Sequence, residues 1–197
     1  MKSSIIAATA LVTAPAAAFA GIKLTRAGYE SPDYKVERKA DGFEIRTYSE
    51  IPVASTKMAP AAGKGEQDSR FMQLFRYIDK GNTDSKKIAM TTPVFMEANG
   101  RDGAMSFVIP SKVAAEGAPS PSGKGVYLDK IKGGKFAVAR FKGKRGGDTE
   151  RAATEKLRAA LKSAGIATKA APPLFAYYDP PWTPKMLRRN EVFLRIK

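Results

Sequence analysis

Side chains suited to ligand binding gather in three segments of this sequence. The segments are residues 71–78 (FMQLFRYI) continuing to 87–94 (KIAMTTPV), residues 107–111 (FVIPS), and residues 176–184 (AYYDPPWTP) followed by 188–192 (RRNEV). Aromatic rings stack on flat apolar molecules, and arginine or lysine side chains pair with carboxylates. These residue types could contact an apolar ring system and pair with acidic groups.

The residues that most catalytic sites use are missing. The chain has 197 residues and contains neither histidine nor cysteine. This excludes Ser-His-Asp and Cys-His catalysis, histidine or thiolate zinc sites, a histidine on a haem iron and covalent c-type haem attachment. No close pair of acidic residues forms a motif, so little equipment for general acid–base catalysis remains. We expect a binding protein with no catalytic residues and no metal site.

The first segment has helical periodicity, which leaves two interpretations open. Phe71, Leu74, Phe75 and Ile78 recur at i, i+3, i+4 and i+7, which predicts a helix over about 68–80 with one apolar face. Such a stripe is typical of a core-facing helix. Arg76 directly follows Phe75, so it can leave the apolar face and reach an acidic group. Phe71 and Phe75 are therefore either core or ligand-binding residues, whereas Leu74 and Ile78 are expected in the core.

The elements around this helix form a repeated order. A hairpin is predicted at 34–48 around Gly42, with an extension at 51–58, and a second hairpin at 126–142 across Gly133-Gly134. The other predicted elements are strands at 87–97, 105–109, 174–178 and 191–196, a connector at 114–125, and a helix at 148–164 capped by Gly165. The helix over 68–80 starts with Asp68 or Ser69 as its cap and stops at Gly81-Asn82.

This order predicts an α+β fold in one domain. The strands form one antiparallel sheet or distorted β-barrel, and the two helices pack outside it. The repeated unit is hairpin–helix–strand–strand, with pseudo-repeats at about 32–113 and 126–197 inside a domain spanning 32–197.

The N-terminus and the net charge indicate where the protein works. Lys2, the apolar stretch of residues 5–18 and the small residues around Phe19 predict a secretory signal peptide cleaved after Ala20, although a retained membrane anchor is the alternative. The mature protein is then periplasmic or secreted, beginning with a flexible arm at 21–31. The net charge of +15 becomes +14 when Lys2 leaves, which favours anionic partners such as a membrane surface or wall polymer. A merely solvated positive surface is the alternative.

In their order and spacing, the three segments resemble the SOUL family of haem-binding proteins over nearly all of the mature chain. The resemblance implies a distorted antiparallel barrel of two pseudo-repeats, similar also to the effector-binding domains of some bacterial regulators. It places the ligand in an apolar cleft between the first helix and the loop before the last strand. Carried over to this chain, it implies haem-cleft residues Phe71, Met72, Phe75, Arg76, Tyr178, Trp182, Lys185 and Met186.

One position departs from the family. Some members carry a histidine, proposed to ligate haem, where this chain has Thr47. Haem would therefore be held with an open iron, or through Met72, Met186 or Tyr178. Residues 188–191 look structural, with Arg189 expected to pair with Glu191 or Asp179.

The leading interpretation is a monomeric, non-catalytic carrier or buffer of haem or a related tetrapyrrole outside the cytoplasm, with no nucleic-acid partner. Two alternatives stay open. One is a binding module for another hydrophobic or amphipathic small molecule. The other is a basic surface protein that binds anionic lipid or wall polymer through its charge.

Overall fold

The computed structural model describes residues 28–57, 64–97 and 103–197. The predicted signal peptide and residues 21–27 of the predicted arm lie outside these ranges. The end of the arm is attached to the domain, because Glu30 accepts a hydrogen bond from the backbone of Thr92 at 2.9 Å and from the backbone of Ser111 at 2.7 Å. None of the helices in the described ranges has the length and apolar character needed to span a membrane.

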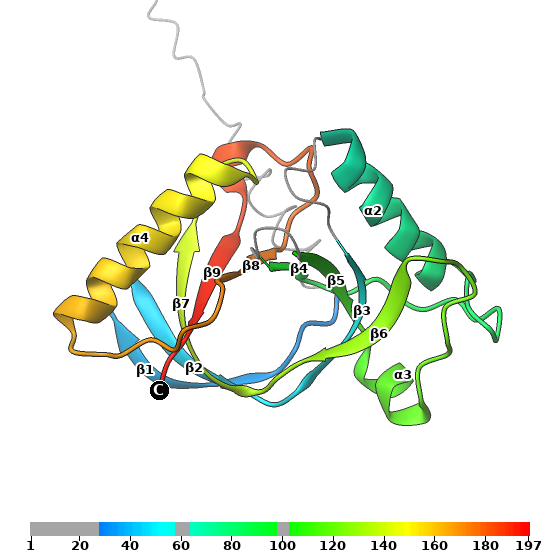
Figure 1. Cartoon of the computed structure of the whole chain (residues 1–197), viewed down its shortest axis with the longest axis horizontal. Coiled ribbons are helices and arrows are strands. Elements are labelled where there is room, and N and C mark those ends of the chain that lie inside the picture. Colours follow the sequence, from blue (N-terminus) through cyan, green and yellow to red (C-terminus); the bar gives the residue numbers. More distant parts are fainter. Residues whose placement is uncertain (1–27, 58–63, 98–102) are drawn as a thin grey trace, which may run out of the picture.

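Nine strands form one curled antiparallel sheet. They are β1 (Tyr34–Ala40), β2 (Phe43–Tyr48), β3 (Ile51–Lys57), β4 (Val94–Glu97), β5 (Ala104–Val108), β6 (Val126–Ile131), β7 (Gly134–Phe141), β8 (Leu174–Tyr177) and β9 (Asn190–Arg195). Their order in the sheet is β1-β2-β7-β9-β8-β4-β5-β3-β6. Figure 1 shows the helices α2 (Lys64–Ile78) and α4 (Gly147–Ser163) packed on the outer face of this curled sheet, one toward each end of that face. The predicted α+β fold is therefore confirmed, and a short helix, α3 (Ser111–Glu116), leads into the predicted connector.

The predicted hairpin across Gly133-Gly134 is wrong. β6 pairs with β3, whereas β7 pairs with β2 and β9, so residues 126–141 form one long bent strand. Its partner is the equally bent strand made of β2 and β3, with Tyr48 opposite Gly134 and Ile51 opposite Ile131. At the bend, a Cβ on Gly133 would lie 2.8 Å from the backbone oxygen of Tyr48. The missing side chain thus lets two backbones meet at a shared corner, and the glycine pair makes a bend instead of a turn.

The pseudo-repeat consequently has a different unit. Each half consists of a bent strand, a helix and a true hairpin: β2–β3, α2 and β4–β5 in the first, and β6–β7, α4 and β8–β9 in the second. The halves meet where β4 pairs with β8 and where the two bent strands pair with each other. β1 pairs with β2 at the edge of the sheet, and the two strands form the hairpin predicted at 34–48. β2 continues into β3, and β6 continues into β7. These two bent strands therefore join the ends of the strand order, and the sheet curls into a distorted barrel.

The helix ends differ in how well the sequence predicted them. α4 agrees within one residue, and Gly165 has the expected left-handed conformation with φ 68°. α2 begins at Lys64, four residues before the predicted cap. It ends at Ile78, two residues before the predicted end, and the left-handed residue that follows is Lys80, with φ 73°, instead of the expected Gly81.

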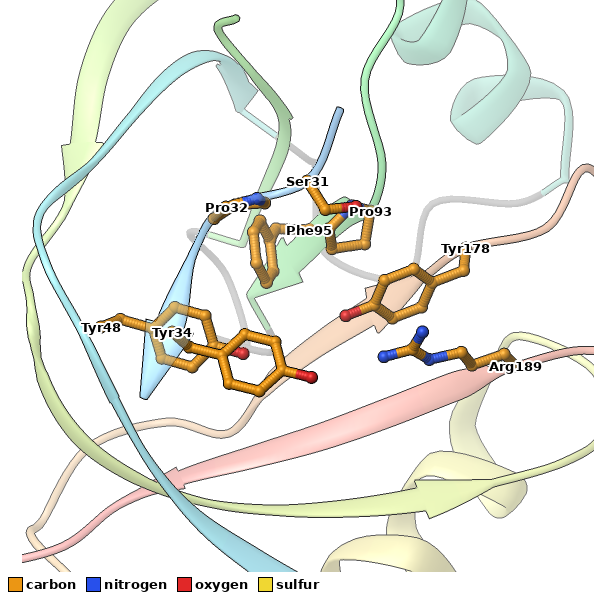
Figure 2. A pocket seen from close by; sticks show the side chains of 8 residues that line it. All are labelled: Ser31, Pro32, Tyr34, Tyr48, Pro93, Phe95, Tyr178 and Arg189. Atoms are coloured by element: carbon orange, nitrogen blue, oxygen red, sulfur yellow. The ribbon is translucent and has the colours of Figure 1, made fainter. Parts of the chain in front are cut away.

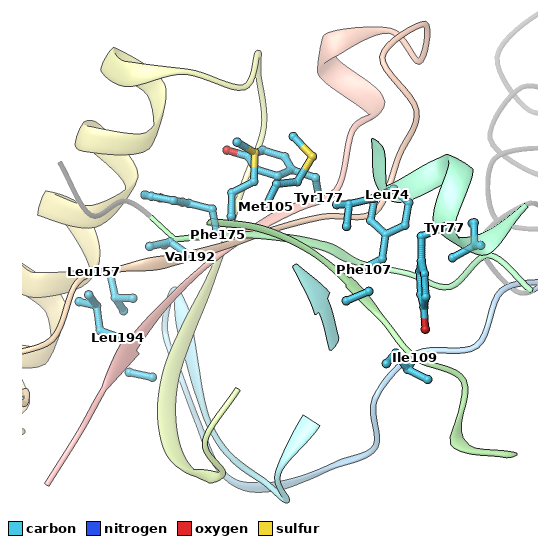
Figure 3. Close-up of a cluster of buried hydrophobic side chains, with 14 of the residues drawn as sticks. Leu74, Tyr77, Met105, Phe107, Ile109, Leu157, Phe175, Tyr177, Val192 and Leu194 are labelled. Atoms are coloured by element: carbon cyan, nitrogen blue, oxygen red, sulfur yellow. The ribbon is translucent and has the colours of Figure 1, made fainter. Parts of the chain in front are cut away.

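The sheet separates two groups of buried side chains. On the face that carries the helices, residues of α2 and α4 meet β5, β8 and β9 (Figure 3); among them are Leu74, Tyr77, Met105, Phe107, Leu157, Phe175, Tyr177, Val192 and Leu194. The inner face buries a second cluster of aromatic and aliphatic residues, which includes Tyr48, Val53, Phe95, Phe136, Tyr178 and Phe193. Leu74 and Ile78 are buried in the first cluster, as predicted.

Candidate functional site

The middle of α2 exposes apolar side chains. Met72 and Phe75 are 43% and 39% exposed, and with Arg76 they share one helix face because they are spaced i, i+3 and i+4. Phe71 is half-buried, with its ring 5.1 Å from that of Phe107 and 6.4 Å from that of Phe75. Phe71 is thus chiefly a core contact that supports Phe75, and Phe75 is the ring available to a ligand. Next to it, Arg76 supplies a solvent-exposed cation.

The loop from β8 to β9 exposes a second apolar group. Trp182 and Met186 are 83% and 72% exposed, with Lys185 exposed between them in the short 3-10 helix η1 (Lys185–Leu187). Arg188 fastens the loop, since its Nε donates to the backbone oxygen of Thr183 at 2.8 Å and its Nη2 donates to that of Pro181. Figure 1 shows this loop at the same end of the molecule as the start of α2.

The loop and helix residues remain two separate groups in the described structure. Within the described residues, no hydrogen bond, ion pair or ring contact joins Trp182, Lys185 or Met186 to Phe75 or Arg76. A ligand that used both groups would have to bridge them. Their exposed apolar area is nonetheless the kind of surface that a flat ligand covers.

Tyr178 does not belong to either group. It is buried on the inner face of the sheet, and its hydroxyl donates to Glu191 Oε2 at 2.9 Å. Burial and the neighbouring Glu191 carboxylate raise the pKa of Tyr178 well above its usual value, so it does not supply a phenolate to iron. The preceding residue, Tyr177, faces the helices instead and bonds Glu150 of α4. The alternation of an extended chain turns the two adjacent tyrosines to opposite faces of the sheet, and both are buried there.

An ion network surrounds Glu191, which is fully buried. Its carboxylate accepts hydrogen bonds from Arg46 at 2.9 Å, Arg189 at 2.8 Å and Arg140 at 3.4 Å. The expected Arg189–Glu191 pair is therefore confirmed, and Asp179 is also used, since it accepts from the backbone N–H of Arg189 at 2.6 Å.

The charges of this network are stabilised by one another. Burial opposes ionisation of Glu191, but the hydrogen bonds from Arg46 and the nearby Arg189 outweigh it and lower its pKa. Likewise, burial opposes the charge of Arg46, and its bonds to Glu191 raise its pKa overall. The burial of Arg46 could not be predicted, because a single arginine in an alternating strand gives no sign of being buried. The one indication in the sequence is that Arg46 lies on the same face of β2 as Tyr48.

Thr47, which occupies the position of the family's histidine, has a structural contact. Its hydroxyl donates to Glu37 Oε1 on β1 at 2.9 Å. Thr47 lies on β2, whereas α2 packs against β3, β5 and β6, so Thr47 lies away from the exposed face of α2. With Tyr178 turned inward, the thioethers of Met72 and Met186 are the exposed candidates for a soft iron ligand.

Two cavities open on the inner side of the sheet, with volumes of about 170 and 250 Å³. Sites that enclose drug-sized ligands measure about 300–1,000 Å³, so neither cavity holds a tetrapyrrole. The exposed face of α2 is therefore the better candidate for a large flat ligand. Across the described ranges, acidic residues form no group of three or more that could hold a metal ion.

Solved structures with the same fold have very different sequences. The crystal structure of the EcmrR C-terminal domain superposes with a TM-score of 0.60 at 12% identity, covering 83% of this chain and 98% of that one. An uncharacterized conserved protein from Listeria innocua gives 0.58 at 9% identity, covering 79% and 92%. A hydrolase from Listeria innocua gives 0.57 at 9% identity, covering 82% and 94%. At such identities the similarity is one of fold alone.

The sequence itself identifies the family. Comparison with curated protein sequences gives no match. The family model described as "SOUL heme-binding protein" matches residues 29–195, which is most of the chain and includes the three segments 71–94, 107–111 and 176–192. That family is one of binding proteins, with haem or a tetrapyrrole as ligand at the family level. The chain therefore belongs to the SOUL heme-binding protein family.

Proposed function

We propose that this protein binds haem or a related tetrapyrrole on the exposed face of α2, without catalysis, as a carrier or buffer outside the cytoplasm. The observation that carries the proposal is the exposure of Phe75 and Met72 beside Arg76. Buried phenylalanine would indicate only a core, whereas an aromatic ring that is 39% exposed leaves apolar area for a ligand to cover.

The residues present fit a tetrapyrrole disc better than they fit its metal. Phe75 and Met72 offer apolar area for the ring, and Arg76, with Lys185 on the loop, offers cations for the propionates. The chain has no histidine, so an axial bond would have to come from the thioether of Met72 or Met186. The iron of bound haem would have a weak axial ligand or none. Most of the affinity would then come from burial of the apolar ring. Binding should therefore differ little between haemin and metal-free protoporphyrin.

A visible-absorbance titration with haemin and with protoporphyrin tests the proposal. The purified protein is compared with a Phe75→Ala, Arg76→Ala variant and with a matched control, Tyr29→Ala, Arg158→Ala, which removes one exposed aromatic and one exposed arginine elsewhere. Saturable one-to-one binding of both porphyrins, weakened only in the first variant, supports the proposal. Binding that both variants retain places the ligand elsewhere, and no saturable binding removes tetrapyrroles as ligands.

The same titration separates this proposal from a module for other amphipathic molecules. Dyes and lipids of similar size are added in parallel, and a preference for porphyrins is expected. A Met72→Ala, Met186→Ala variant removes apolar area for both porphyrins, so it should weaken haemin binding more than protoporphyrin binding if either sulfur reaches the iron.

Export is the second part of the proposal. Its support is the composition of residues 1–20, which has the charge, apolar stretch and small residues of a signal peptide. Fractionation of bacterial cells that express the full-length chain should recover the protein outside the cytoplasm, with a mass that corresponds to a chain starting at Gly21. Full-length protein in the cytoplasm or in the membrane fraction contradicts this.

One group of residues favours a second candidate, an anionic surface as partner. The backbone N–H of Gly143 donates to the carbonyl of Lys185 at 3.3 Å, which places the lysines of segment 142–144 beside the loop that exposes Trp182 and Met186. Tryptophan next to lysine is a common arrangement at membrane interfaces. Sedimentation with vesicles of anionic lipid, repeated at rising salt, tests it: binding that decreases steeply with salt and needs Trp182 supports this candidate.

A further inference from the structure

The smaller inner cavity, of about 170 Å³, has the composition of a binding site. Figure 2 shows its lining: aromatic rings from β1, β2, β4 and the end of β8, two prolines, a serine and the guanidinium of Arg189. The rings are those of Tyr34, Tyr48, Phe95 and Tyr178. A hydrogen bond of 2.9 Å between the hydroxyls of Ser31 and Thr92 fixes the segment that closes one side.

The charge at this cavity is positive. Arg189 is the one charged residue among those that line it. The nearby Glu191 carboxylate is fully buried and already accepts hydrogen bonds from three arginines and from Tyr178. Asp179 accepts from the backbone N–H of Arg189 and does not line the cavity. An aromatic box of this kind attracts cations when a free carboxylate accompanies it, but here the carboxylate is neutralised.

Hydrogen-bond donors remain for an anion. Arg189 donates from Nε and Nη2 to Glu191 Oε1, and its Cζ lies 3.9 Å from the centre of the Tyr178 ring. Its Nη1 takes no part in the hydrogen bonds to Glu191. In Figure 2 the Arg189 guanidinium and the Tyr34 hydroxyl point toward the same space. The Tyr48 hydroxyl accepts from Arg46 at 3.3 Å and keeps its own proton to donate; burial raises the pKa of Tyr48 to about 12, so that proton stays on at neutral pH.

We propose that this cavity is a second ligand site, which binds a small monocarboxylate with an apolar or aromatic body. The carboxylate lies on Arg189 and the hydroxyls of Tyr34 and Tyr48, and the body packs against Phe95 and the two prolines. The volume is close to that of the engineered cavity of about 150 Å³ that holds benzene, so the ligand is of about the size of benzoate. This site is separate from the face of α2 and goes beyond tetrapyrrole binding.

Calorimetric titration with a charge series tests the proposal. The probes are benzoate, neutral benzyl alcohol and cationic benzylamine, which have similar bodies and different heads. Benzoate is expected to bind at least 10-fold more tightly than the other two, because a charged hydrogen-bonded pair contributes a factor of roughly 10 to 100. Equal affinities, a preference for benzylamine or no saturable benzoate binding would each overturn it.

Two variants locate the site. Arg189→Gln and Arg140→Gln each remove one guanidinium from Glu191, but Arg189 alone of the two lines the cavity. Benzoate affinity should fall roughly 10- to 100-fold in Arg189→Gln and change less than 3-fold in Arg140→Gln. If Arg189→Gln does not fold, Tyr34→Phe serves instead, because it deletes one hydroxyl from a side chain that is 38% exposed. Unchanged benzoate binding in the folded cavity variant refutes the assignment.

The outcome is independent of tetrapyrrole binding. Saturating protoporphyrin should leave benzoate affinity unaltered, and Phe75→Ala, Arg76→Ala should do the same. Competition between the two ligands would mean that they share one site and would reject a separate carboxylate site.

Discussion

Replacing Glu191 by glutamine is the sharpest test of how the inner half of this structure holds together. Glu191 is completely buried on β9, and its carboxylate joins Arg46 of β2, Arg140 of β7 and Arg189 of the preceding loop. Tyr178 donates to the same group at 2.9 Å. One negative charge therefore links three neighbouring strands and the segment that carries the cavity's arginine.

The expected cost follows from the burial of its partner. The Arg46 side chain is only 1% exposed, so removing the charge of Glu191 leaves a buried guanidinium whose remaining carboxylate partner is the partly exposed Glu44. Breaking a buried ion pair on one side costs about 3–5 kcal/mol. Glutamine keeps an acceptor oxygen, so the lower end, about 3 kcal/mol, is expected for Glu191→Gln. With a urea m-value of about 2 kcal/mol/M, the unfolding midpoint should fall by about 1.5 M.

Urea unfolding followed by circular dichroism measures this, with Glu44→Gln as the matched control. Glu44 is 26% exposed and contacts the same arginine through its Nε at 2.8 Å. That substitution should cost less than about 1 kcal/mol, because partly solvated pairs contribute little. Equal costs for the two variants, or a cost for Glu191→Gln below about 1 kcal/mol, would refute the view that buried charge compensation organises this region.

Three further predictions use the same assay. Because the pKa of Glu191 is lower in the folded state, the unfolded state binds this proton more readily. The stabilisation from Glu191 is therefore fully present above about pH 4.5 and is lost as the pH falls through the lower native pKa. The free energy of unfolding should fall less steeply with acid in Glu191→Gln than in the parent protein, and a parallel decline would contradict this. Gly133→Ala should cost about 1–3 kcal/mol because its Cβ would meet backbone at the bend, whereas Gly123→Ala, with open space around it, should cost almost nothing. Leu74→Ala should cost about 2–5 kcal/mol and Phe75→Ala less than about 1.5, and a reversed order would make Phe75 a core residue.

The family resemblance and the element order were readable from local patterns. The helical stripe of residues 71–78 and the glycine cap at Gly165 depend on contacts within a few residues, so the sequence predicts them well. The start of α2 at Lys64 was not predicted, because no capping residue or apolar stripe marks it. The pairing Arg189–Glu191 was also predictable, since the two residues are close in the chain.

What the sequence alone determined is which residues have the character for binding: aromatic rings and cations in three segments, and no histidine or cysteine. Tertiary structure decided which of them a ligand can reach. The pairing of the two bent strands closes the barrel through contacts about 85 residues apart, such as Tyr48 with Gly134, and local periodicity holds no information about such partners. That closure turns Tyr178 inward and Tyr177 toward the helices, buries Arg46 with Glu191, and leaves Phe75 exposed. Sequence gives the chemistry of a side chain, but its accessibility depends on the side of the sheet that it faces once distant strands have paired.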